Sequence, residues 1–289
     1  MTAALATDGL GHRYGRSRWA LRACTLEVPA GRVVALVGPN GSGKSTLLHT
    51  AAGLLAPSEG SVHVAGAAPA RSLARIGFVA QDAPLWPRLR VAEILEAGRH
   101  LNAHFDTPFA RGRISQLEIA PRARVQTLSG GQRAQLALTM VLAKHPDLLL
   151  LDEPLANLDP VARREFLASM FAACTDSGAT VVFSSHVVAE LERICDHLIV
   201  LRDGRVSLVG DIDDLRESHR IVSGPQGWPE PRATPVICAR DAAGRTTALL
   251  RCDPAAALGP GLDETLPTFD ELVLGYLEQP SPDHQESVR

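Results

Sequence analysis

The residues best suited to chemistry form one glycine-rich run, Gly38-Pro39-Asn40-Gly41-Ser42-Gly43-Lys44-Ser45-Thr46. Its spacing, G-x-x-x-x-G-K-[ST], is typical of a loop whose backbone N–H groups surround a phosphate. Lys44 can reach the terminal phosphates of a nucleotide, and the Ser45 hydroxyl can ligate Mg²⁺. The run therefore predicts that the chain binds a nucleoside triphosphate together with Mg²⁺.

The neighbouring residues supply the elements that such a loop needs. The β-branched run 33–37 predicts a buried strand before the loop, and 47–53 predicts a helix after it. A new helix adds its positive end to the phosphate site. A Gly/Pro turn that happens to end in Lys-Ser is the alternative, and the strand and helix on either side make it the weaker explanation.

An acid pair, Asp152 and Glu153, directly follows the apolar run 148–151. A short, wholly apolar run is typical of a strand covered on both faces of a parallel sheet. Open sheets of this kind bind ligands at the carboxyl ends of their strands. Beside a triphosphate, one carboxylate can hold Mg²⁺ and the next can orient and deprotonate the attacking water. We therefore expect Asp152 near the metal and Glu153 as the general base.

A second candidate phosphate site follows Leu128, in the run Ser129-Gly130-Gly131-Gln132. Ser129 and Gln132 have the spacing of a capping box, which predicts that a helix begins here. Two glycines leave the first N–H groups of this helix uncovered, so its end can also bind an anion. Because the Lys44 loop already surrounds one side of a triphosphate, this second helix end would be most useful on a partner chain.

The remaining pattern alternates strands with helices, which predicts an open parallel sheet with helices packed on it. We expect further strands at 24–28, 61–64, 76–79, 179–183, 197–201 and 205–209, a mostly helical region at 84–144, and a helix at 187–195. Beyond residue 215 the composition changes. There we expect a loop or linker at 224–231, strands at 236–238 and 246–250, a final helix at 271–278 capped by Thr268, and a disordered tail from 281.

Composition limits the class of protein. A hydrophobic fraction of 45% with 21% charged residues is ordinary for a soluble domain, and the net charge of −3 gives no reason to expect a nucleic-acid partner. Five cysteines without C-x-x-C spacing favour reduced thiols over disulfides or zinc. We find no run of about 18 apolar residues and no secretion signal. We expect a cytoplasmic protein, or one held at a membrane by another chain.

Taken in order, these motifs resemble those of the nucleotide-binding subunits of ABC transporters. The resemblance covers roughly residues 5–215, with the Walker A loop at 38–46, the signature at 128–132 and the Walker B strand at 148–153. It implies an α/β, P-loop NTPase fold with a RecA-like parallel-sheet core, an N-terminal antiparallel β subdomain and a helical signature subdomain at about 84–144. Residues 216–289 would form a small C-terminal accessory segment.

The resemblance also implies roles for single residues. Tyr14 would stack on the adenine, and Gln81 would touch Mg²⁺ or the attacking water and report to the membrane partner. Asp159 would belong to the loop that crosses to a second subunit, and His186 would contact the γ-phosphate. Two positions depart from the usual pattern. Gln135 stands where a basic residue is usual, and Asn157 stands where a small residue is common.

The function implied by the resemblance is ATP hydrolysis that powers a membrane-spanning permease on a separate chain. Two nucleotide-binding subunits, identical or different, would sandwich two ATP molecules on the cytoplasmic face of the membrane. The general look of the chain, including residues 269–277, is similar to bacterial exporter subunits, among them drug exporters. The apolar residues Pro84, Leu85 and Trp86 either contact the permease or cover the core.

Two other classes of function compete with this one. An ABC-type ATPase acting on DNA needs a long heptad insertion, but only about eighty residues separate the phosphate loop from the signature, and ribosomal types carry two cassettes. A non-hydrolysing binding module is the other class, and the presence of Gln81, Glu153 and His186 argues against it.

Overall fold

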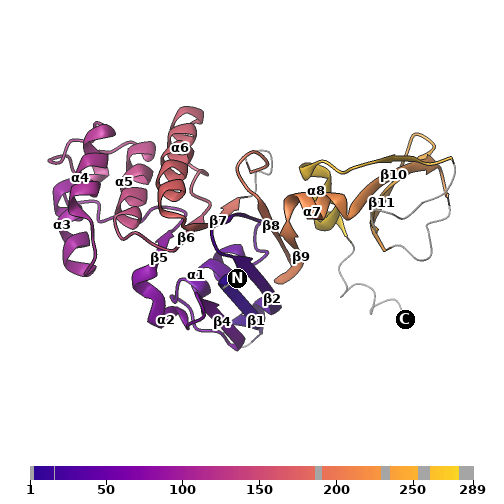
Figure 1. Cartoon of the computed structure of the whole chain (residues 1–289), viewed down its shortest axis with the longest axis horizontal. Helices are drawn as coiled ribbons and strands as arrows, with labels where there is room; N and C mark the ends of the chain where they lie inside the picture. The colour runs from indigo at the N-terminus through magenta and orange to yellow at the C-terminus, as the bar shows by residue number, and fades with distance from the viewer. Residues whose placement is uncertain (1–2, 16, 186–190, 229–234, 253–260, 280–289) are drawn as a thin grey trace.

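The computed structural model describes residues 3–15, 17–185, 191–228, 235–252 and 261–279. Its centre is a six-stranded sheet in the order β5-β6-β7-β3-β8-β9 (Figure 1). The strands are β5 (Ile76–Val79), β6 (Leu148–Asp152), β7 (Thr180–Ser185), β3 (Val33–Val37), β8 (His197–Arg202) and β9 (Arg205–Asp211). All neighbours pair in parallel except β8 and β9. Strands β6 and β7 are buried throughout, as their apolar sequences predict.

A three-stranded antiparallel sheet, order β2-β1-β4, packs against this centre. It consists of β1 (Ala3–Tyr14), β2 (Arg18–Pro29) and β4 (Glu59–Val64). Helix α1 (Lys44–Ala51) lies between the two sheets, and its Leu47 and Leu48 are fully buried in the cluster that joins them. Helix α1, which begins at the end of the phosphate loop, is therefore held by packing against both sheets.

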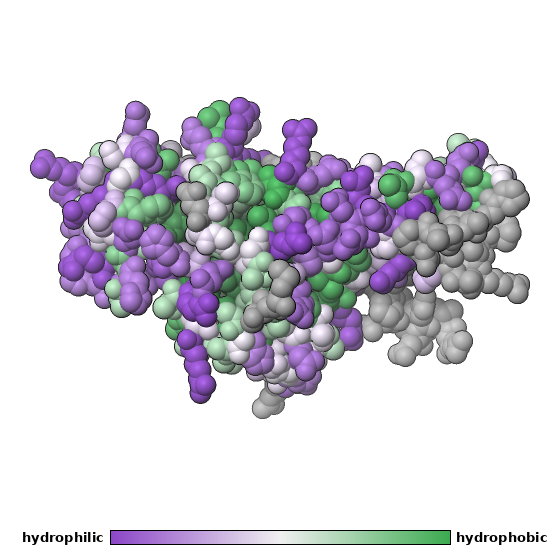
Figure 2. Space-filling view, viewed as in Figure 1, coloured by the Kyte–Doolittle hydropathy of each residue, from purple (hydrophilic) through white to green (hydrophobic). Residues whose placement is uncertain are grey.

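The helical part lies at one end of the molecule (Figure 1). It contains α3 (Val91–Leu101), α4 (Thr107–Gln116) and α5 (Gly130–Leu142), which share their own apolar cluster. The next helix, α6 (Pro160–Ser177), packs against α5. The expected helical region at 84–144 is confirmed. On the face seen in Figure 2, hydrophilic side chains cover this end, and hydrophobic ones gather toward the middle of the molecule.

The C-terminal residues form a four-stranded antiparallel sheet in the order β11-β12-β10-β13. Its strands are β10 (His219–Pro225), β11 (Val236–Ala242), β12 (Arg245–Arg251) and β13 (Asp263–Thr265). Helix α7 (Ile212–Glu217) leads into this sheet and α8 (Phe269–Glu278) follows it. The α8 residues Phe269 and Leu272 are fully buried in the same cluster as Val200 of β8. This packing joins the C-terminal residues to the central core.

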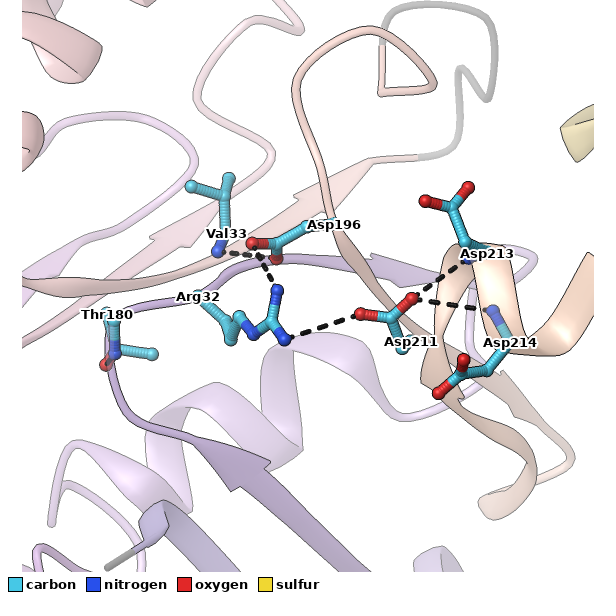
Figure 3. A network of polar contacts seen from close by, with 8 residues as sticks. Arg32, Val33, Thr180, Asp196, Asp211, Asp213 and Asp214 are labelled. Atoms are coloured by element: carbon cyan, nitrogen blue, oxygen red, sulfur yellow. Dashed lines mark hydrogen bonds and ion pairs between the residues drawn. The ribbon is translucent and has the colours of Figure 1, made fainter. Parts of the chain in front are cut away.

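An ionic network ties the central sheet to α7 (Figure 3). The Arg32 guanidinium lies 3.2 Å from the Asp196 carboxylate and 3.5 Å from that of Asp211. Asp196 also accepts a hydrogen bond from the backbone N–H of Val33 at 3.0 Å. Asp211 caps α7 by accepting from the N–H groups of Asp213 and Asp214. The beginnings of β3 and α7 are thus held at one point.

The expected loop or linker at 224–231 is only partly right. In the expected linker, Gly224 and Pro225 end β10, and Trp228 is buried with its indole N–H donating to Thr246 O at 3.1 Å. Residues 229–231 lie outside the described residues. The composition of this stretch is that of a loop, but an apolar cluster formed by distant strands accommodates Trp228.

The expected helix at 187–195 is only partly within the described residues, so it stays a prediction. Residues 187–190 lie outside the described residues, and 191–195 form a turn in which Ile194 N and Cys195 N donate to Leu191 O. Asp196 N already bonds Val33 O as the chain enters β8, which ends the turn. By contrast, the final helix is confirmed and begins at Phe269, with the Thr268–Glu271 capping box in place. The tail from 281 is outside the described residues.

Cys24 and Cys174 are buried, whereas Cys195, Cys238 and Cys252 are half-buried. None of the helices in the described parts of the chain combines the length and apolar character that a membrane-spanning helix requires.

Candidate nucleotide-binding site

The phosphate loop connects the end of β3 to the first residue of α1, Lys44. Gly41 and Gly43 have φ values of 82° and 107°, in the left-handed region that favours glycine. A Cβ on Gly43 would lie 2.6 Å from the carbonyl oxygen of Ala20. Only a glycine allows the loop to approach β2 this closely. The loop therefore has the shape of a backbone cradle, which fits a phosphate group.

Lys44 is held inside this loop, with its side chain only 5% exposed. Its Nζ donates to Gly38 O at 2.7 Å and to Pro39 O at 3.3 Å. The same ammonium lies 3.4 Å from Glu153 Oε1. The structure thus brings together the cation and one of the two acids that the sequence predicted for this site.

The acid pair is positioned by Ser184, at the end of the neighbouring strand. In the parallel register of β6 and β7, Asp152 is opposite Ser184. Ser184 Oγ donates to Asp152 Oδ1 at 2.9 Å and accepts from the Glu153 backbone N–H at 2.8 Å. Glu153 has a φ of 44°, which is unfavourable for a residue with a side chain. The serine therefore holds the backbone where Glu153 turns toward Lys44.

A cavity of about 690 Å³ lies beside the phosphate loop. Nine of the sequence-predicted residues line it: Tyr14, Asn40, Gly41, Gly43, Lys44, Ser45, Thr46, Gln81 and Glu153. The other lining residues are Arg18, Trp19, Ala20 and Ala156. Groups that the sequence predicts to bind phosphate, to bind metal and to activate water thus line one cavity. The Ser45 hydroxyl and the Gln81 amide oxygen in this lining are oxygen donors, which suit Mg²⁺.

Four predicted residues are near this cavity without lining it. Gly38 and Pro39 use their carbonyl oxygens to hold Lys44. Asp152 and Ser42 are each 3% exposed. Ser42 Oγ is buried without a hydrogen-bond partner among the described residues, so it is a donor that a bound phosphate could satisfy.

Tyr14 is the lining residue for which the family resemblance predicts stacking on the adenine. Tyr14 is 46% exposed, and its ring packs edge-on against His12, with 4.8 Å between the ring centroids. Its hydroxyl lies 3.4 Å from Thr46 Oγ1, on the helix that follows the phosphate loop. The ring is therefore anchored beside the loop while much of it stays accessible.

The signature residues lie elsewhere. Ser129 caps α5 by accepting from Gln132 N at 3.1 Å, and Gln132 Oε1 accepts from Ser129 N, so the predicted capping box is confirmed. Ser129 and Gly130 are exposed. A separate hollow of about 230 Å³ is lined by Ser129, Gly131, Gln132 and Asp159, among others. None of its lining residues lines the larger cavity, so the described residues of one chain do not bring the signature to the Lys44 loop.

Asp159 has a structural contact in its own chain. Its carboxylate caps α6 by accepting from Val161 N at 2.9 Å and Ala162 N at 3.0 Å. The side chain is exposed at the rim of the signature hollow. His186 lies outside the described residues, so its position is not assigned.

The structure also accounts for Gln135, which stands where a basic residue is usual. Gln135 is 4% exposed, and its Oε1 accepts from the Arg113 guanidinium at 3.0 Å. Arg113, on α4, also donates to Thr139 Oγ1 at 3.0 Å, and burial lowers the pKa of its guanidinium. A charge from another helix therefore reaches the signature helix. Sequence reasoning missed it because Arg113 belongs to no motif.

Comparisons with known proteins agree with this geometry. A family model described as "ABC transporter" matches residues 21–156, and one described as "AAA domain, putative AbiEii toxin, Type IV TA system" matches 124–192. The aliphatic sulfonates import ATP-binding protein SsuB of Pseudomonas putida is 37% identical over 247 residues, which cover 78% of this chain and 89% of that protein. The phosphonates import ATP-binding protein PhnC of Anaeromyxobacter dehalogenans is 35% identical, over 81% of this chain and 53% of that protein.

Among solved structures, the ATP-binding subunit of an ABC transporter superposes with a TM-score of 0.66 at 27% identity, covering 74% of this chain and 92% of that one. The predicted α/β P-loop NTPase fold is thereby confirmed. The chain belongs to the ABC transporter family and is one of its ATP-binding subunits, an ATPase.

Proposed function

We propose that this chain hydrolyses ATP in the 690 Å³ cavity to power solute transport through a separate membrane-spanning subunit. The observation that carries the proposal is the shared lining of that cavity by Lys44, Ser45, Gln81 and Glu153. These side chains supply the cation, the hydroxyl, the amide and the carboxylate that phosphoryl transfer to water requires.

Each residue has a distinct part in this proposal. The phosphate loop and Lys44 bind the triphosphate, and the Tyr14 ring receives the adenine. Ser45, Gln81 and Asp152 hold Mg²⁺, which neutralises charge on the phosphates when bound. Glu153 orients and deprotonates the attacking water, and His186 contacts the γ-phosphate. Because Lys44 now lies 3.4 Å from Glu153, a bound triphosphate would share this ammonium with the base.

A second nucleotide-binding subunit, identical or different, completes the site in this proposal. The exposed Ser129 and Gly130 at the start of α5 would face the triphosphate bound to the partner's Lys44 loop, together with Gly131 and Gln132. The separate hollows of the two motifs support this arrangement, because a single chain leaves its signature unused. Asp159, at the rim of the signature hollow, would approach the same partner.

The membrane-spanning subunit would dock near Gln81, which follows β5. Leu85 packs against the core clusters, whereas the Trp86 side chain is 55% exposed. The sequence left two roles open for this apolar stretch, contact with the permease and covering of the core. Leu85 covers the core, whereas the exposed Trp86 is available for contact with the permease. Through this contact the chain would sit on the cytoplasmic face of the membrane.

The direction of transport is a separate question. The expectation of export, including drug export, rests on the general look of the sequence. SsuB and PhnC are named as import proteins, and this favours import over the expected export. The direction of transport can be measured with inside-out vesicles that contain the complete transporter. ATP-driven uptake of the solute into the vesicles indicates export, and ATP-driven loss of the solute from preloaded vesicles indicates import.

The proposed activity is tested first on the isolated chain. Replacing Lys44 with alanine removes the main cation of the phosphate site, so we expect Mg-ATP turnover to fall by about 100-fold or more. Arg122→Ala, which removes an exposed positive charge from the helical part, serves as the matched control and should keep wild-type turnover. Turnover by Lys44→Ala at the wild-type rate would refute the site.

A further inference from the structure

Two residues of the nucleotide cavity carry a positive charge, Lys44 and Arg18, and one carries a negative charge, Glu153. Lys44 is buried and already bonded to Gly38, Pro39 and Glu153. Arg18, the first residue of β2, is exposed and belongs to no motif that the sequence analysis singled out. The more accessible cation of the cavity lining is therefore Arg18.

The pairing of β1 with β2 fixes the direction of Arg18. It is directly opposite Tyr14 in the antiparallel register. Residues directly opposite each other in such a pair share a face of the sheet, with Cβ atoms about 4.5–5.5 Å apart. The Tyr14 hydroxyl, 3.4 Å from Thr46 Oγ1, shows that this face is directed at the phosphate loop. Arg18 and the proposed adenine platform therefore share the face of the hairpin that is directed at the phosphate loop, and both line the nucleotide cavity.

The neighbouring arginine provides a contrast. Arg13 is opposite Trp19 in the same register, and its guanidinium lies over the indole ring, 5.3 Å from the centroid. Because successive side chains alternate across a strand, Arg13 is on the other face of β1 from Tyr14. Arg13 does not line the nucleotide cavity among the described residues, and Arg18 does.

We propose that Arg18 is a nucleotide-binding residue that contacts the phosphate nearest the nucleoside, an inference that rests on the function proposed above. A guanidinium offers paired N–H donors that match phosphate oxygens, and its charge is always present. Lys44 reaches the terminal phosphates of the nucleotide. Arg18, which lies beside Tyr14, is therefore the cation that would neutralise the phosphate attached to the ribose.

Three ligands and two variants test this. Affinities of Mg-ATP, Mg-ADP and adenosine are measured by calorimetry or by competition, for the wild type, Arg18→Gln and Arg13→Gln. Arg18→Gln should weaken both Mg-ATP and Mg-ADP by about tenfold and leave adenosine unchanged, since one charge-assisted contact to a phosphate is lost. Arg13→Gln removes the same charge from a side chain that does not line the cavity, although its guanidinium packs on the cavity residue Trp19. Because adenosine binding reports any change in that ring, the ratio of nucleotide affinity to adenosine affinity should stay at the wild-type value in this control.

The outcomes separate the two proposals. A wild-type chain that binds no Mg-ATP would refute the proposed function, and this inference with it. A wild-type chain that binds Mg-ATP while Arg18→Gln binds it equally well would overturn the role of Arg18 alone. An equal loss for adenosine and the nucleotides would overturn the phosphate contact. Equal losses in Arg18→Gln and Arg13→Gln would also overturn it, because general surface charge would then explain the effect.

Discussion

Ser184 is bonded to both acids of the candidate site through one hydroxyl. It donates to Asp152 Oδ1 and accepts from the backbone N–H of Glu153. Ser184 is fully buried, so each group would lose its partner without gaining water if the hydroxyl were removed. The left-handed φ of Glu153 makes that N–H contact important, because strained backbone persists only where its surroundings fix it.

We therefore expect Ser184→Ala to lower kcat by about tenfold while the Kd of Mg-ATP stays close to the wild-type value. The phosphate loop is untouched, but the backbone that aims the Glu153 carboxylate is released. Urea unfolding should show a loss of about 1–3 kcal/mol. Ser72→Ala is the matched control, since Ser72 is a buried serine whose hydroxyl donates to Val64 O away from the acids. The control should lose stability and keep kcat; a Ser184→Ala chain with wild-type kcat would contradict this role.

The sequence predicted single residues well where one continuous motif contains them. Lys44, Ser45 and Glu153 line the cavity as expected, because spacing along the chain determines their position. Ser184 and Arg18 were missed, since their relations to Asp152 and Tyr14 come from pairing between separate strands. Spacing along the chain does not contain that register. The roles of the site residues stay predictions, and His186 is outside the described residues.

At the scale of elements, Arg113 links α4 to the signature helix α5. Its guanidinium donates to Gln135 Oε1 and to Thr139 Oγ1, both buried. Gln135 Nε2 has no hydrogen-bond partner among the described residues, so this amide depends on the single contact to Arg113. The cost of burying the amide is offset only while that contact exists. The position of α5, and with it of Ser129, therefore depends on α4.

A double-mutant cycle measures this link. Arg113→Met should destabilise the chain by about 1–3 kcal/mol, because it leaves the Gln135 amide buried and unsatisfied. Gln135→Met removes the polar group itself, so the double variant should be more stable than the sum of the two single losses predicts. We expect a coupling of about 1 kcal/mol from urea unfolding. Additive losses would mean that the two side chains do not support each other.

Elements with strong local patterns were predicted, and those that depend on distant partners were not. The apolar runs of β3, β6 and β7 are strands as expected. Trp228, in a stretch that has the composition of a linker, is buried because β10 and β12 provide a cluster for its ring. This burial depends on tertiary contacts, which composition and periodicity do not report.

At the scale of the whole molecule, the cassette and the C-terminal sheet share one core. Phe269 and Leu272 of α8 belong to the same apolar cluster as Val200 and Phe183 of the central sheet. The Arg32 network adds a polar tie at the start of α7 (Figure 3). A division of the chain into 1–215 and 216–289 stays a proposal, and any such division would have to cut through this cluster.

The last prediction concerns the pairing of two whole chains. If two copies clasp ATP between the Lys44 loop of one and the Ser129 helix of the other, the pair should persist when hydrolysis is slow. Glu153→Gln removes the general base, so we expect turnover to fall by about 100-fold or more. With saturating Mg-ATP this variant should elute from gel filtration as a dimer, and with ADP it should elute as a monomer.

Adding Ser129→Glu to the Glu153→Gln chain should abolish the dimer, because a carboxylate would then face the partner's phosphates. The nucleotide should still bind to each monomer, since Ser129 does not line that chain's own cavity. A Glu153→Gln chain that stays monomeric under saturating Mg-ATP would contradict the shared site.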